Sequence, residues 1–185
     1  MRLLGAVALF VLGAIIAGVA IDDANSERAR IDERQRRLGA IEWESLPLQW
    51  AITTVRGTGR RKIAILSDPN CPYCRRLEET VAKLDDITVH ILPYAILGPA
   101  SEAQAKAVWC SNDRARAWDD LMFRRIAPSS SEACDTPIDK LIAYGYGIRA
   151  AATPTWFLES GERHTGAPPL VELQRRLDAA SLAKR

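Results

Sequence analysis

The chain has 185 residues, of which 48% are hydrophobic and 26% charged, a composition typical of a globular protein with a real core. This length predicts one domain with a short extension. Its 25 Lys and Arg residues nearly balance its 23 Asp and Glu residues, which leaves a formal net charge of +2. No predicted helix carries a basic cluster, so the charge pattern excludes an electrostatic footprint for nucleic acid and no nucleic-acid partner is expected.

An uncharged run extends from Leu3 to Ile21, between Met1-Arg2 and Asp22-Asp23. At about 1.5 Å per residue, an apolar helix of this length nearly spans the hydrocarbon core of a membrane. One base before the run and two acids after it are typical of an N-terminal segment that directs the export of the remaining chain. Residues 1–21 are therefore predicted to be a signal peptide or a membrane anchor, in contact with the membrane through residues 3–21 if they are not cleaved.

Beyond this segment, the pattern divides into two parts. Residues 22–45 interleave acidic and basic side chains, which favours a charged helical linker exposed to solvent. Residues 46–185 have the pattern of a compact α/β domain. Strands are expected at residues 50–55, 62–66, 87–92, 155–158 and 163–165. Helices are expected from 72 to about 84, in an insertion at about 99–149 that opens with a capping box of Ser101 and Gln104, and after Pro169. This order of strands and helices predicts a thioredoxin-like fold with a helical insertion.

Two of the four cysteines lie in the run Cys71-Pro72-Tyr73-Cys74. Pro72 suits the first position of a helix, which places Cys71 at the N-cap and Cys74 one turn later. The unpaired N–H groups and the positive end of the helix dipole stabilise a thiolate on Cys71, so it is the better nucleophile and leaving group. Cys74, shielded within the helix, suits the resolving role. The pair is predicted to be a redox-active disulfide that needs no other cofactor.

The same cysteine spacing begins many zinc sites, which need two further nitrogen or sulfur ligands. Cys110 and Cys134 are not at the spacing of a zinc knuckle, and the two histidines, at 90 and 164, lie in a strand and in a hairpin. No metal site is therefore predicted. As a disulfide, Cys110 and Cys134 would stabilise the fold by about 3 kcal/mol through loop closure. A structural role is expected for them, and a second redox pair is the alternative.

A second element of the predicted site is Thr153-Pro154, just before the strand at 155–158. In a thioredoxin-like fold a proline here is cis and faces the two cysteines of the active-site helix across a groove. The backbone of Thr153 would then pair with an extended substrate peptide. The alternative is an ordinary trans proline that opens a strand. The Cys71–Cys74 motif behind an upstream strand favours the cis form.

Several motifs resemble one family when they are taken together. They are the runs at residues 67–74, 108–111 and 117–122, then Cys134 and the run at 153–155. Over about residues 46–182 the chain resembles the DsbC/DsbG disulfide isomerases of the bacterial periplasm. The resemblance implies that Cys71 attacks and Cys74 resolves, that Thr153-Pro154 form the cis-proline substrate loop, and that Cys110 and Cys134 form a structural disulfide.

Three further residues of the motif could tune the site. Asp68 occupies the acidic position before the active-site helix, where it either tunes proton transfer or simply starts the turn. Pro72 and Tyr73 separate the two cysteines and influence the reduction potential of the pair.

The resemblance implies an exported disulfide reductase or isomerase in the periplasm, soluble or anchored. Its substrates would be protein disulfides or thiols, and a membrane redox partner would recycle its active site. Residues 22–45 are too few for the separate N-terminal domain through which that family's isomerases dimerise, so thiol exchange is a firmer expectation than general isomerase activity. Two alternatives stay open: a dithiol oxidase that donates disulfides, and a non-catalytic, tethered chaperone or binding module.

Overall fold

The computed structural model describes Ser26 and residues 39–128 and 134–183 of the chain. The predicted signal peptide or anchor at residues 1–21, with its apolar helix, lies outside these residues, as does most of the predicted linker. No helix within the described part of the chain is both long enough and apolar enough to cross a membrane.

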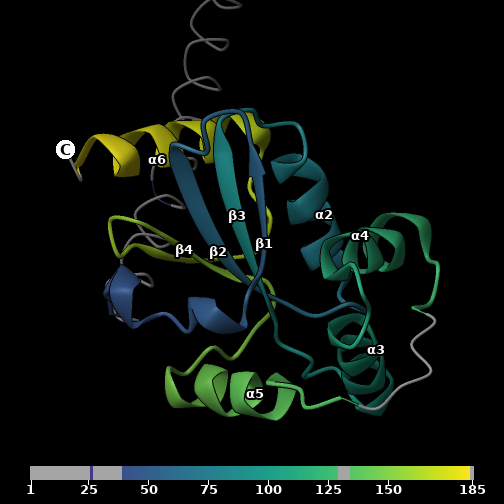
Figure 1. The fold of residues 1–185 in the computed structure, drawn as a ribbon. Coiled ribbons are helices and arrows are strands. Elements are labelled where there is room, and N and C mark those ends of the chain that lie inside the picture. Colours follow the sequence, from purple (N-terminus) through teal and green to yellow (C-terminus); the bar gives the residue numbers. More distant parts are fainter. Residues whose placement is uncertain (1–25, 27–38, 129–133, 184–185) are drawn as a thin grey trace, which may run out of the picture. The chain divides into compact units, whose positions relative to one another are not determined.

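Among the described residues, five strands form one sheet in the order β1-β3-β2-β4-β5 (Figure 1). Strands β2 and β3 are parallel, and every other neighbouring pair is antiparallel. The strands are β1 (Ile52–Arg56), β2 (Arg61–Ser67), β3 (Ile87–Pro93), β4 (Thr155–Leu158) and β5 (Arg163–Thr165). The predicted strands are all present within about two residues of their expected bounds, and the fold is thioredoxin-like.

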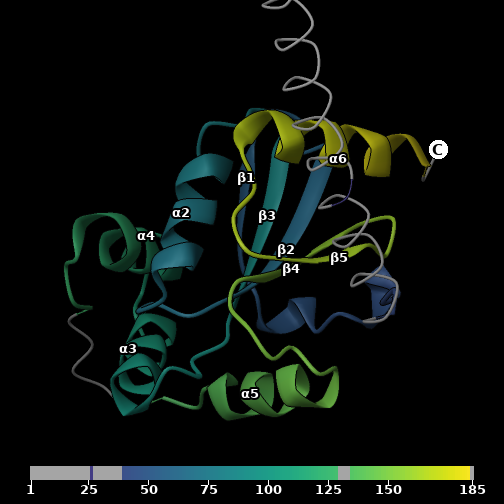
Figure 2. The same ribbon diagram turned by 180° about the vertical axis from the view of Figure 1, so that it is seen from behind.

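The helices follow the predicted order as well (Figure 2). They are α2 (Pro72–Val81), α3 (Pro99–Trp109), α4 (Arg114–Arg124), α5 (Ile138–Gly147) and α6 (Leu170–Ala183), with short 3-10 turns η1 (Trp43–Ser45) and η2 (Leu48–Trp50) before the sheet. Helices α3, α4 and α5 form the helical insertion expected at about 99–149. Helix α2 ends at Val81, three residues before its predicted end. Both views place α5 and α6 at opposite ends of the domain.

The central strand β2 is buried on both faces of the sheet. Ile63 and Ile65 pack on one face with buried side chains of α2, α4 and α6. Ala64 and Leu66 point to the other face, where α5 and the 3-10 turns cover them. This explains why β2 is an uninterrupted apolar run rather than an alternating one, since a strand covered on both faces has no solvent side.

The compact unit begins at Ala40, within the segment expected to be a linker. The Ile41 N–H donates to the Gly161 carbonyl at 3.1 Å, and Trp43 is buried with its ring edge-on to His90 at 5.9 Å. The domain therefore includes these residues because two apolar side chains, Ile41 and Trp43, pack against it. The mixed charges around Ile41 and Trp43 in the sequence led to their assignment to the linker.

Two glycines of α5 give a test of how tightly this helix is packed. A Cβ at Gly145 would overlap the ring of Tyr94, which is fully buried and held by a 3.0 Å hydrogen bond from its hydroxyl to the Ala150 carbonyl. Nothing lies within 4 Å of a Cβ at Gly147. We expect Gly145→Ala to lower the free energy of unfolding by about 1–3 kcal/mol through overpacking.

The matched control, Gly147→Ala, should be neutral or stabilise by up to about 1 kcal/mol, because alanine loses less backbone entropy than glycine. Urea denaturation of both variants measures the difference. Equal stabilities for the two variants would contradict the packing described here.

Candidate functional site

The two cysteines of the motif lie where β2 gives way to α2. Cys71 is the N-cap of α2 and Pro72 its first residue, as the sequence predicts. Both cysteines are free thiols; Cys71 is 4% exposed and Cys74 is completely enclosed. The Cys74 backbone N–H donates to the Cys71 sulfur at 3.4 Å, so an N–H group at the start of the helix faces that sulfur. This is where a negative charge on Cys71 would be stabilised.

The surroundings of Cys74 oppose its ionisation. Burial raises the pKa of its thiol, because the charged form loses its hydration. The Asp68 backbone N–H, 3.4 Å from the Cys74 sulfur, and the Ser67 hydroxyl act in the opposite direction and are weaker than burial. The two thiols are therefore unequal: Cys71 is the N-cap of α2, whereas Cys74 lies within the helix and is shielded from solvent.

Thr153 and Pro154, which are distant in the sequence, lie next to Cys71. The Thr153–Pro154 peptide bond is cis, as expected of a thioredoxin-like fold. The Cys71 thiol donates a 3.3 Å hydrogen bond to the Thr153 carbonyl oxygen across 82 positions of sequence. Pro154 is buried, whereas Thr153 is half-buried. The structure thus brings together Cys71, Cys74 and the Thr153-Pro154 loop.

Asp68 is a fully buried carboxylate that holds the turn before Cys71. Its Oδ1 accepts hydrogen bonds from the Asn70 backbone N–H and the Ser101 hydroxyl, both at 2.8 Å. Its Oδ2 accepts from the Leu97 backbone N–H at 2.9 Å, and its carbonyl accepts from the Cys71 N–H at 3.1 Å. Of its two expected roles, this geometry favours the turn-forming one, because described backbone and hydroxyl donors occupy both carboxylate oxygens.

The predicted capping box at Ser101 and Gln104 is wrong. Helix α3 begins two residues before Ser101, with Gly98 as a cap that makes no side-chain hydrogen bond. Ser101 and Gln104 instead accept hydrogen bonds from the Asn70 side-chain amide, both at 2.9 Å. Their polar side chains are turned toward the turn before Cys71, a long-range use that local spacing cannot distinguish from a cap.

Tyr73 lies on the surface beside the cysteines, 56% exposed, with the Arg76 guanidinium 5.4 Å from its ring centre. Arg75, the residue after Cys74, is half-buried. Its Nε donates a 2.5 Å hydrogen bond to the Met122 carbonyl at the end of α4. Arg75 therefore ties the active-site helix to the insertion, while Tyr73 and Arg76 remain at the surface.

Sequence reasoning missed a buried acid one turn beyond Cys74. Glu78 accepts a 2.5 Å hydrogen bond from the Ser67 hydroxyl and a 2.7 Å hydrogen bond from the Trp118 indole N–H. Burial raises the pKa of the Glu78 carboxyl to about 7, against the lowering effect of these two donors, and the nearby Asp119 charge raises it further. An acid at helical spacing from Cys74, on the apolar face of a predicted helix, is the signal that could have identified it.

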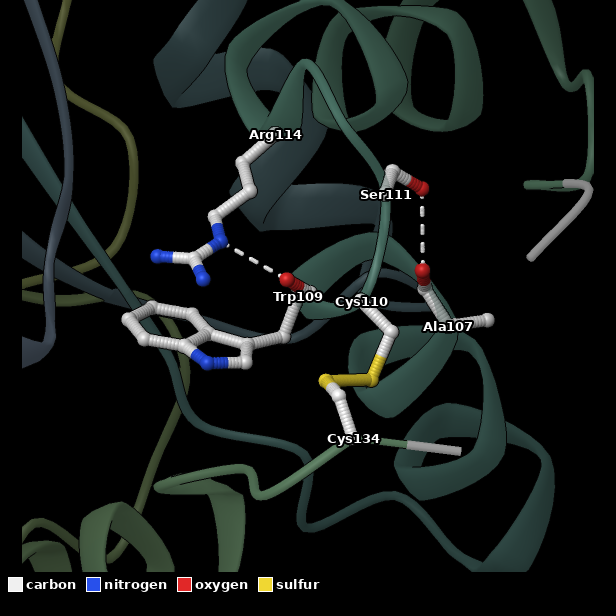
Figure 3. The surroundings of a disulfide bond; sticks show 6 residues. All are labelled: Ala107, Trp109, Cys110, Ser111, Arg114 and Cys134. Atoms are coloured by element: carbon white, nitrogen blue, oxygen red, sulfur yellow. Dashed lines mark hydrogen bonds between the residues drawn. A yellow bond between two sulfur atoms is a disulfide. The ribbon is translucent and has the colours of Figure 1, made fainter. Parts of the chain in front are cut away.

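Cys110 and Cys134 are joined by a disulfide with a Cα–Cα distance of 5.7 Å (Figure 3), which is the pair that the family resemblance implies. Next to it, Arg114 lies over the Trp109 ring at 4.0 Å, and its Nε donates to the Trp109 carbonyl at 2.7 Å. Within the insertion, Cys110 caps the end of α3 and Cys134 lies just before α5. In the described part of the chain, no three His, Cys, Asp or Glu side chains are grouped to hold a metal ion.

A family model described as a thioredoxin-like domain matches residues 48–181, so the chain belongs to the thioredoxin-like family. Within this family it is similar to the DsbC-type thiol:disulfide interchange proteins. It is 41% identical over 84% of its length to the "Probable thiol:disulfide interchange protein DsbC" of Bordetella pertussis. It is 34% identical over 63% of its length to the thiol:disulfide interchange protein DsbC of Escherichia coli K12.

A solved structure extends this similarity to three dimensions. The crystal structure of a disulfide interchange protein from Neisseria gonorrhoeae superposes with a TM-score of 0.70 at 34% identity, covering 74% of this chain and 99% of that one. The chain spans about half the length of the curated relatives it matches, 55% of the Bordetella protein and 50% of the E. coli protein.

The disulfide in the insertion gives a test of its structural role. Replacing Cys110 and Cys134 together with serine should lower the free energy of unfolding by about 3 kcal/mol, because the reduced chain regains loop entropy in the unfolded state. Thiol exchange at Cys71 should persist at temperatures where the variant is folded. Denaturant unfolding and alkylation of Cys71 measure the two effects. Loss of Cys71 reactivity in the folded double variant would contradict a purely structural role.

Proposed function

We propose that the chain is an exported thiol–disulfide oxidoreductase that reduces or isomerises protein disulfides through Cys71 and Cys74. The observation that carries the proposal is the 3.3 Å hydrogen bond from the Cys71 thiol to the Thr153 carbonyl. It sets the N-terminal sulfur of the active-site helix against the Thr153-Pro154 loop, with the thiol of Cys74 enclosed one turn behind. The names of the relatives agree with this chemistry.

The reaction begins when the sulfur of Cys71, as thiolate, attacks one sulfur of a client disulfide. A bond forms between Cys71 and the client, the client's own S–S bond breaks, and the second client sulfur leaves as a thiolate. The Cys74 backbone N–H, at the start of α2, faces the sulfur on which charge would be held before the attack. The loop at Thr153 and Pro154 would bind the client beside that sulfur, by pairing its backbone with an extended segment.

Two routes then release the client from the mixed disulfide. In reduction, Cys74 attacks the Cys71 sulfur, so that the two cysteines are oxidised to a disulfide and the client is left with two thiols. In isomerisation, another client thiol attacks the client sulfur of the mixed disulfide and Cys71 is returned reduced. A dithiol oxidase would run the same exchange in reverse, and the reduction potential of the pair against glutathione separates these directions.

The proposed setting is the periplasm, where client proteins carry disulfides or their precursor thiols. A membrane redox partner would return the oxidised pair to the dithiol form after each reduction. Residues 1–21 would direct export, and would anchor the domain if they are retained.

Single-cysteine variants test the proposal directly. Cys71→Ser should abolish reduction of insulin disulfides, because the attacking sulfur is gone. Cys74→Ser should accumulate a mixed disulfide through Cys71, visible as a larger species that dithiothreitol dissolves. Mass spectrometry of the trapped species, from extracts of exported proteins, would also name the client.

A non-catalytic chaperone would instead protect clients from aggregation in the variant that lacks both Cys71 and Cys74. Full insulin reduction by the Cys71→Ser protein would overturn the proposal outright. Circular dichroism of each variant shows whether it is folded.

A further inference from the structure

The loop that carries Thr153 and Pro154 has no regular secondary structure of its own. Residues 148–154 lie between the end of α5 and the start of β4, and none of them belongs to a helix or a strand (Figure 2). Carbonyl groups in such a loop depend on donors from other parts of the chain. The position of the Thr153 backbone next to Cys71 is therefore set by contacts that the rest of the domain makes to the 148–154 loop.

Every second carbonyl of the 148–154 loop accepts a hydrogen bond from the body of the domain. The carbonyl of Thr153 lies between two of these held carbonyls, and it accepts from the Cys71 thiol instead. The loop is thus fixed in a form that leaves the Thr153 carbonyl directed at the active site. The carbonyls at positions 148, 150, 152 and 154 accept, in that order, from Arg163 Nη1 at 2.6 Å, the Tyr94 hydroxyl at 3.0 Å, the Thr155 hydroxyl at 2.6 Å and the Gly166 backbone N–H at 3.0 Å.

Two of these donors come from the hairpin that follows the loop, and two come from side chains that serve no other part of it. Thr155 is the first residue of β4, and Gly166 directly follows β5, so the hairpin itself brings them to the loop. Tyr94 and Arg163 instead reach the loop with their side chains, across 56 and 15 positions of sequence. These two side chains are the groups that could be changed without altering the pairing of the strands.

Tyr94 connects the 148–154 loop to the strand that leads to the cysteines. Its backbone N–H donates at 2.8 Å to the carbonyl of Ser67, the last residue of β2, and its hydroxyl donates to the carbonyl of Ala150. Its ring is completely enclosed and lies against Gly145, where a Cβ would overlap it. Burial raises the pKa of the Tyr94 hydroxyl to about 12, so this group keeps the proton that it donates. Tyr94 therefore sets the separation between the end of β2 and the loop.

Arg163 is a buried cation, 3% exposed, that lies opposite Phe157 in the β4–β5 pair. Burial lowers the pKa of its guanidinium, and the ionisable groups that act on this pKa among the described residues are Tyr144 and Tyr94 rather than a carboxylate. Its Nη1 donates to the Ile148 carbonyl at the start of the loop. Because a buried charge is unfavourable without hydrogen bonds, and hydrogen bonds from charged donors are strong, this contact holds the carbonyl firmly.

We propose that Tyr94 and Arg163 are positioning residues for client binding, an inference that rests on the proposed function. They hold the 148–154 loop in the form in which the Thr153 backbone can pair with an extended client segment beside Cys71. A loop that is already ordered loses less conformational entropy when the client binds. Both side chains are buried, so they act through the loop and contact neither the client nor the reacting sulfurs. Their effect is on the binding of peptide clients rather than on the reactivity of Cys71.

Two disulfide substrates, each attacked by the reduced protein, separate these effects. Hydroxyethyl disulfide is too small to pair with the loop, so its rate constant measures the reactivity of Cys71 alone. A linear peptide that carries a fluorophore, and is joined through its cysteine to a quenching group, measures attack on an extended segment. In Tyr94→Phe we expect the ratio of the peptide rate constant to the hydroxyethyl disulfide rate constant to fall about fivefold, the effect of about one hydrogen bond.

Two further variants control this measurement. Tyr146→Phe removes an exposed hydroxyl from the ring that lies edge-on to Tyr94 at 6.1 Å, and it should leave the ratio unchanged. Arg163→Met removes the guanidinium but keeps an apolar side chain beside Phe157, and it should lower the ratio at least as much as Tyr94→Phe does. A role limited to overall stability or to the reactivity of Cys71 would lower both rate constants together and leave their ratio unchanged.

The outcomes separate the positioning role from the function on which it rests. If the wild-type protein attacks neither substrate, the proposed function fails. If the wild-type protein attacks both, and Tyr94→Phe keeps the wild-type ratio, the positioning role is wrong and the function stands. Circular dichroism shows whether each variant is folded. Should Tyr94→Phe fail to fold, Arg163→Met decides in the same way: a lower ratio supports the positioning role, and an unchanged ratio overturns it.

Discussion

The buried carboxylate of Asp68 is the interaction on which the geometry of the site depends. Burying a carboxylate costs several kcal/mol unless hydrogen bonds compensate. Here the donors to its side chain come from the turn itself, from the loop after β3 and from α3. These contacts fix the connection between β2 and α2, in which Cys71 lies three residues after Asp68. The position of the Cys71 sulfur at the N-cap therefore depends on how firmly this turn is held.

Much of this arrangement could be predicted from the sequence, for identifiable reasons. Pro72 marks a helix start by local chemistry, so it placed Cys71 at the N-cap and Cys74 inside the helix. Thr153-Pro154 lay outside the reach of local patterns, and the order of elements located it opposite the cysteines. Periodicity and turn chemistry, together with a known fold order, were sufficient for these residues.

The distant partners of the polar side chains could not be predicted. Ser101 and Gln104 matched a capping pattern, but their partner is Asn70, about thirty positions earlier. The helical spacing of Glu78 from Cys74 indicates the face on which it lies, but its partner Trp118 is forty positions later in the chain. The spacing of residues in a sequence predicts which of them share a helix face, but it does not predict which distant residue will be hydrogen-bonded to them.

The helical insertion supports the active site through hydrogen bonds to α2 and to the turn before it. Three buried or half-buried polar side chains in α2 or just before it, Asp68, Arg75 and Glu78, each find a partner in the insertion. Ser101 on α3 serves the first, and α4 serves the others through the Met122 carbonyl and the Trp118 indole. Without α3 and α4 those groups would lose buried partners at a cost of about 1–3 kcal/mol each. The sheet and α2 alone would therefore supply the two thiols without the hydrogen bonds that the insertion makes to α2 and to the turn before it.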